Sequence, residues 1–196
     1  MNIETREFFD RNAALWDSYE KPGIVPVIDA ILDRIGLDAS DSVLDVGCGT
    51  GILVPHLERR GVRSFRGIDL SPEMVREYLR KFPGRAVVAA DYEEKDLYAP
   101  GSFSRIIIFN AFPHFDRREL VFENSYNYLR PGGGLYIAHS MSRAELDRHH
   151  REAGEAVADH MLYSNTGFRE LYAGAGFGGI EVDDGPRFFS CGFKYP

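Results

Sequence analysis

The chain has 196 residues, 44% of them hydrophobic and 27% charged, which is enough to bury one sizeable core and is ordinary for a globular domain. Its formal net charge of −7 argues against nucleic acid as a ligand, because phosphate binding normally shows as clustered Lys and Arg in excess. The first residues are charged and no apolar run approaches the ~18 residues of a membrane span. We therefore expect a cytoplasmic protein without a signal peptide or membrane contact. Cys48 and Cys191 have no partners at short spacing, which disfavours a disulfide framework and a cysteine zinc site.

Residues 1–36 predict an N-terminal helical cap. Aromatic side chains recur over residues 8–19, and Lys21-Pro22-Gly23 ends this first helical segment. Pro26 is expected to open a second amphipathic helix that stops at Gly36. Such helices are suited to cover a sheet or to close over a site.

From residue 43 onward, short apolar runs alternate with helical patterns. We expect strands at 42–47, 65–69, 85–91, 105–110 and 134–139, and Ser71 caps one of the intervening helices. Two last strands follow a further helix and are joined by a short turn at 183–186. The fold class is therefore α/β, with a doubly wound, mostly parallel seven-stranded sheet and one antiparallel strand near the C-terminus. Residues 1–196 would form a single domain, with a helical segment inserted at 141–165.

A glycine-rich turn, LDVGCGTGIL at 44–53, follows the first predicted strand and precedes a helix. Glycines at 47, 49 and 51 let the backbone turn tightly and approach a ligand, and the helix N-terminus offers N–H groups to it. The dinucleotide fingerprint G-x-G-x-x-G is the natural rival, but Ile52 stands where its third glycine belongs. An NAD-linked oxidoreductase is therefore a disfavoured alternative.

The segment from Asp45 to Gly51 resembles motif I of the class I S-adenosylmethionine (SAM) dependent methyltransferases, and further landmarks of that family occur in order over residues 40–140. The resemblance implies that Asp69, followed by Leu70, holds the ribose hydroxyls of SAM or S-adenosylhomocysteine (SAH). It also implies that Asp91 accepts from the adenine amino group and that Tyr92 flanks the ring. Asp45 has two open roles, ordering the loop or contacting the ligand. The implied cofactor-binding residues are Tyr19, Asp45, Gly47, Gly49, Gly51, Asp69, Leu70, Asp91, Tyr92 and Asn110.

Histidines mark the expected methyl-acceptor end of this site. His114 and His139 follow the fourth and fifth predicted strands, whose ends lie side by side in a parallel sheet. Ser142 and Glu145 form a capping box that starts a helix, and helical spacing turns His150 toward the body of the protein, with His160 close to the same face. His114, His139 and His150 are the candidate catalytic residues. With His160 they could instead bind a divalent transition metal, line a hydrogen-bonding or acid–base pocket, or be structural.

The predicted function is methyl transfer from SAM to a small molecule bound at the carboxyl ends of the fourth and fifth strands, with a histidine base or a histidine-bound metal. Residues 110–113 depart from the Asn-Pro-Pro-aromatic motif of many methylases of adenine and glutamine nitrogens, which disfavours those acceptors. A SAM- or nucleotide-binding protein without methyltransferase activity is the main alternative. The sequence predicts neither the acceptor nor the oligomeric state.

Overall fold

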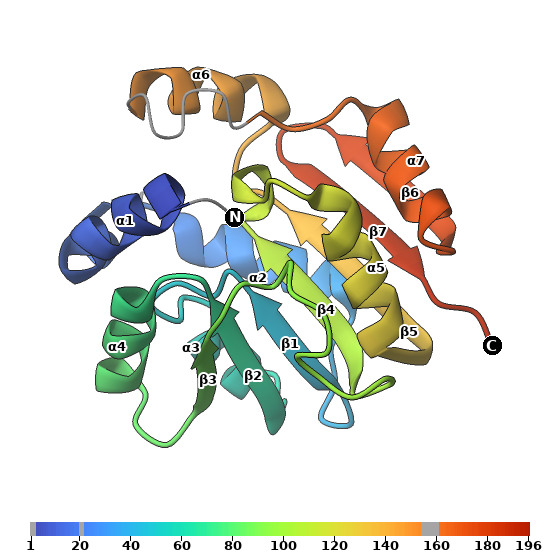
Figure 1. Ribbon diagram of the computed structural model, residues 1–196, viewed down its shortest axis with the longest axis horizontal. Coiled ribbons are helices and arrows are strands. Elements are labelled where there is room, and N and C mark those ends of the chain that lie inside the picture. The colour runs from blue at the N-terminus through green and yellow to red at the C-terminus, as the bar shows by residue number, and fades with distance from the viewer. Residues whose placement is uncertain (1–2, 20–21, 154–160) are drawn as a thin grey trace.

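A computed structural model describes the backbone of residues 3–19, 22–153 and 161–196, and the side chains of these residues except 149–153. Seven strands in these ranges form one sheet in the order β3-β2-β1-β4-β5-β7-β6. Only β7 runs antiparallel to its neighbours among the described strands, so the predicted sheet with one antiparallel strand is confirmed (Figure 1). The strands are β1 Ser42–Val46, β2 Ser64–Asp69, β3 Ala86–Ala89, β4 Phe103–Phe109, β5 Leu129–Ala138, β6 Gly178–Asp184 and β7 Phe188–Phe193.

Helices cover both faces of the sheet. Helices α2, α3 and α4 contribute to the core on one face, and α5 and α7 to the core on the other. Helices α1 and α6 lie at the end of the sheet to which the arrows of the parallel strands point (Figure 1). None of the described helices is both long and apolar enough to cross a membrane. The helical elements are α1 Ile3–Asn12, η1 Ala13–Tyr19, α2 Ile24–Ile35, α3 Val54–Arg59, α4 Pro72–Lys81, η2 Phe112–His114, α5 Arg118–Tyr128, α6 Arg143–Ala153 and α7 Asn165–Gly174.

Strand β4 shows why the apolar runs form a parallel sheet. Ile106 and Ile108 belong to the core on one face, and Ile107 and Phe109 to the core on the other. All four are at most 6% exposed. A strand buried on both faces needs apolar residues at every position, so its sequence is continuous rather than alternating.

Local signals place most element boundaries. The Ser71 hydroxyl accepts from the Met74 N–H at 3.0 Å, as predicted for the cap of α4. Helix α2, however, begins at Ile24 and not at Pro26. Pro26 fits inside the first turn because the first four N–H groups of a helix have no partner within it. Strand β5 begins at residue 129, before the predicted 134, because that residue pairs with β4 ahead of a register shift.

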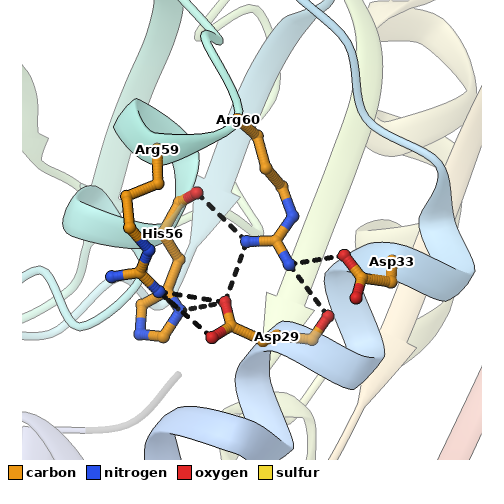
Figure 2. Close-up of polar contacts among 5 residues, drawn as sticks. All are labelled: Asp29, Asp33, His56, Arg59 and Arg60. Atoms are coloured by element: carbon orange, nitrogen blue, oxygen red, sulfur yellow. Dashed lines mark hydrogen bonds and ion pairs between the residues drawn. The ribbon is translucent and has the colours of Figure 1, made fainter.

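A polar cluster fixes α2 against α3 (Figure 2). The Asp29 carboxylate accepts from Arg59 and Arg60 and lies 2.8 Å from His56 Nδ1. Arg60 also donates to Asp33 and to the Asp29 carbonyl. The hydrogen bond from His56, followed by that from Arg60, holds the pKa of Asp29 well below its usual range. The cluster thereby positions α2, whose first turn lines the cavity at the ends of the strands.

Candidate active site

The glycine-rich turn folds tightly over the end of β1. Gly47 and Gly49 have φ angles of 69° and 53°, a region that favours glycine. A Cβ atom on Gly47 would come within 2.5 Å of the Ala111 Cβ, and one on Gly49 would point toward Trp16 Nε1 at 3.8 Å. The Gly47 N–H donates to the Ile68 carbonyl at 2.8 Å, which ties the turn to β2. Glycine at position 47 therefore allows the close contact with Ala111, and the backbone of the turn borders the cavity at Gly47 and Gly49.

Asp69 lies at the carboxyl end of β2 and faces the same space. Its two carboxylate oxygens accept from the Gly49 N–H at 2.8 Å and from the Ser71 N–H at 2.9 Å. Burial is the main cause that raises its pKa to about 6, and the nearby Asp10 adds to the rise. Each carboxylate oxygen has a second lone pair for a ligand donor. Asp69 is thus held in place by the turn while it remains able to bind two further donors.

Asp45 lies inside β1, beside Gly67 of β2 and Ile107 of β4. It is 4% exposed and is not among the described residues that line the cavity. Burial, and then the charge of Asp69, raise its pKa to about 8, so the acid is mostly protonated at neutral pH. Of its two predicted roles, this position favours support of the loop over contact with a ligand.

Of the two predicted residues after β3, Tyr92 and Asp91, only Tyr92 is among the described residues that line the cavity. Tyr92 lines the cavity, and its hydroxyl lies 3.0 Å from the Ser125 hydroxyl. Asp91 accepts from the Glu93 N–H at 2.9 Å and lies 3.9 Å from the Arg117 guanidinium, outside the described cavity lining. The predicted contact of Asp91 with adenine is therefore not visible in the cavity geometry.

The ends of β4 and β5 are joined by an amide side chain. Asn110 has a φ angle of 55°, and its Oδ1 accepts from the Ser140 N–H at 2.8 Å. Its Nδ2 donates to the Ser140 hydroxyl at 3.2 Å. Both residues line the cavity. Asn110 therefore joins the segment after β4 to the segment after β5 at the edge of the cavity.

The two predicted histidines with described side chains at this end of the sheet differ in their place relative to the cavity. His114, in η2, lines the cavity, and its ring lies 5.1 Å from that of Phe9 with an angle of 77° between the planes. His139 is fully buried, lies 6.1 Å from the Phe188 ring, and is outside the described lining. Of these two histidines, His114 borders the cavity and His139 does not. The His150 side chain and all of His160 lie outside the described residues.

The cavity that these elements enclose measures about 780 Å³, toward the upper part of the range for ligand sites. Gly47, Gly49 and Leu70 line it near β1 and β2, while Gly51 packs against Tyr78 and Phe82 instead. Within the described part of the chain, no group of three or more His, Cys, Asp and Glu side chains could hold a metal ion.

Aromatic residues of the N-terminal segment form the roof of the cavity. Phe9 packs edge-on against Trp16 at 5.4 Å, and Trp16 lies 6.3 Å from Tyr19, a predicted cofactor-binding residue that also lines the cavity. The aromatic spacing at 8–19 was the sequence signal for this roof. Phe8 and Asn12, on the same segment, also line the cavity.

Two carboxylates attach this roof to the body of the protein, and the sequence reasoning missed both. The Thr50 hydroxyl donates to Asp17, and Lys81 Nζ donates to Asp17 at 2.7 Å. Burial raises the pKa of Asp17, but the hydrogen bonds from Lys81 and Thr50 outweigh it and lower that pKa overall. Asp10 accepts from the Ser71 hydroxyl at the start of α4. The roof is therefore attached to the same turn and helix that border the cavity.

Comparison with known proteins gives a consistent picture. The family described as "Methyltransferase domain" matches residues 44–137. The ubiquinone biosynthesis O-methyltransferase of Xanthomonas campestris pv. campestris (strain B100) is 33% identical over 143 residues, 66% of this chain and 59% of that protein. The chain spans between 4% and 59% of the lengths of the first four curated relatives.

Solved structures share the whole fold at low identity. A SAM-dependent methyltransferase structure from Methanococcus maripaludis has a TM-score of 0.76 at 20% identity, over 95% of this chain and 94% of that one. Phosphoethanolamine N-methyltransferase 2 of Haemonchus contortus, in complex with phosphomonomethylethanolamine and SAH, has a TM-score of 0.78 at 18% identity. That match covers 100% of this chain and 61% of the other.

Proposed function

The chain belongs to the class I SAM-dependent methyltransferases, and we propose that it transfers the methyl group of SAM to a small molecule bound at the carboxyl ends of β4 and β5. One observation carries this proposal: a single cavity joins the glycine turn and Asp69 at one end to His114 at the other. A cavity of about 780 Å³ suits a small-molecule acceptor. The named activity of the Xanthomonas relative, O-methylation in ubiquinone biosynthesis, supports the same class.

The residues near β1 and β2 fit SAM. Bound there, SAM supplies a methyl group on a positively charged sulfonium. Gly47 and Gly49 leave room for close approach of the backbone, because a Cβ on Gly49 would project toward Trp16 across the opening. Asp69 is proposed to accept from the two ribose hydroxyls, since its oxygens are fixed by backbone N–H groups. Tyr92 would flank the adenine.

His114 is the proposed general base. It lies in η2, directly after β4, and Phe9 packs on its ring. An acceptor that carries a proton must lose it as the new bond to carbon forms, and an imidazole beside the acceptor can take that proton. The aromatic roof would exclude water from this step and hold the acceptor in line with the methyl group.

A metal-assisted version of the reaction has less support. His139 lies in the core, and the described residues offer no three-ligand group. The remaining candidate ligands, the side chains of His150 and His160, lie outside the described residues. Elemental analysis of untagged protein distinguishes the versions. Stoichiometric metal that is lost from a His139→Ala/His150→Ala variant would replace the base model with the metal model.

The proposed function is tested in two stages. Isothermal titration of the apo protein should show saturable binding of SAM and SAH in the micromolar range, weakened at least tenfold by Asp69→Ala. No binding to the wild type would refute the proposal. Transfer of labelled methyl groups to small molecules of a metabolite extract should then fall steeply in His114→Gln, with SAH affinity unchanged. Binding without transfer to any acceptor would favour the non-methylating alternative, and binding of NADH the oxidoreductase.

A further inference from the structure

The acceptor end of the cavity has a distinct chemical character. Its lining comes from the N-terminal roof, the first turn of α2 and the start of α6, and its side chains are mostly apolar or aromatic, with Asn12, Asn110 and Ser140 as polar members. Its apolar members include Phe9, Ile24, Val27, Met141 and Leu146. Such a surface binds by excluding water from apolar groups and by edge contacts between rings.

Cationic side chains are absent from the described lining of this cavity. Among those residues none is Lys or Arg, and Asp69 is the single carboxylate. The nearby cations point elsewhere. Lys81 binds Asp17 and Thr50, and the Arg118 guanidinium donates to the Phe115 and Pro113 carbonyls. An anion placed here in the SAH complex would lose its hydration without gaining a counter-ion from the described lining, which is unfavourable in an apolar site.

We infer that the acceptor is an uncharged molecule with an aromatic or apolar body that carries a hydroxyl group. This inference rests on the proposed function and specifies its substrate class. The hydroxyl oxygen forms the bond to the methyl carbon, and the carbon–sulfur bond breaks with its electron pair going to sulfur. The hydroxyl proton passes to His114. An acceptor bearing a phosphate, such as the ligand named for the Haemonchus neighbour, is excluded by the same reasoning.

Trp16 provides the assay, because it is the chain's single tryptophan and lines this cavity. SAH-saturated protein is titrated with para-propylphenol, tyramine and para-hydroxyphenylpropionate, which share one phenol and differ in the charge of their tails. Trp16 fluorescence reports binding. We expect the uncharged phenol to bind at least tenfold more tightly than the carboxylate. Equal or tighter binding of the carboxylate, or no binding of the uncharged phenol, overturns the inference.

Two matched variants test the cause. Val27→Arg places a guanidinium in the lining, whereas Val25→Arg places it on the same helix at a residue that is 50% exposed and outside the lining. The first should raise carboxylate affinity relative to phenol affinity at least tenfold, and the second should leave that ratio unchanged. An unchanged ratio in both would show that charge does not set selectivity.

The two proposals fail separately. Calorimetry with SAH on the same preparation decides the proposed function before any phenol is added. If SAH binds and the phenols do not discriminate, the substrate class is wrong while the proposed function stands. If SAH does not bind, both are refuted.

Discussion

Acidification should weaken SAH binding through Asp69. Burial raises the pKa of this carboxyl from 3.8 to about 6, so a proton occupies the free site in mildly acidic solution. In the proposed complex the ribose hydroxyls donate to the ionised form, so the ligand would have to displace that proton. With a pKa of about 6, roughly one site in ten is ionised at pH 5, so the dissociation constant should rise about tenfold between pH 8 and pH 5. That change corresponds to about 1.4 kcal/mol of binding free energy.

An Asp69→Asn variant provides the decisive comparison. It keeps the side-chain shape but lacks the charge, and at pH 8 it should lose the ~1.5–3 kcal/mol typical of hydrogen bonds to a charged group, about 10- to 150-fold in affinity. Titration calorimetry at several pH values should show a flat profile for this variant once the ligand's own titration is subtracted. His114→Gln, which retains Asp69, should show the same dependence of SAH affinity on pH as the wild type. Equal wild-type affinity at pH 5 and pH 8 would refute the reasoning, as would a slope that survives in Asp69→Asn.

Two further predictions concern the attachments of the roof and of α2. Asp17→Asn removes the ion pair with Lys81. The Asp17 side chain is 45% exposed and the Lys81 side chain 23%, so solvent screens the pair, which is worth ~0.2–1 kcal/mol. SAH should then dissociate about 1.4- to fivefold faster in stopped-flow measurements of Trp16 fluorescence. An unchanged rate would show that the pair does not restrain the roof. Asp29, whose pKa is lowered, stabilises the fold above the unfolded-state pKa of ~4, and this contribution is lost as the pH falls further. The melting temperature of the wild type should exceed that of Asp29→Asn at pH 7, and this difference should narrow below pH 4. The exposed Asp33→Asn should show a smaller difference from the wild type. A difference in melting temperature that does not depend on pH would contradict the ionic origin.

The order of elements, and the end of the cavity formed by the glycine turn and Asp69, could be predicted from the sequence because their signals are local. Continuous apolar strands such as β4 are buried on both faces, and the turn residues Gly47 and Gly49 directly follow one strand. Asp69 ends the next strand, and parallel strands bring their carboxyl ends to one edge. The positions along the chain therefore determined which of these groups could meet.

The direction of single side chains at the acceptor end needed the tertiary structure. Successive residues at a strand end point to opposite sides, so placing a residue near the edge does not decide whether it faces the cavity. His139 is buried in the core, whereas its neighbour Ser140 lines the cavity and binds Asn110. Likewise Tyr92 faces the cavity and Asp91 turns toward Arg117.

The sequence by itself determined the doubly wound sheet, the glycine turn and the aromatic content of the N-terminal segment, because each depends on residues close together in the chain. Only the tertiary structure decided where that segment docks. Its attachment joins Asp17 to Thr50 and Lys81, the latter 64 residues away in sequence. Docking on that scale depends on the packed shape of α1, α4 and the turn together, and no local pattern encodes it. The aromatic roof over the described cavity follows from that docking.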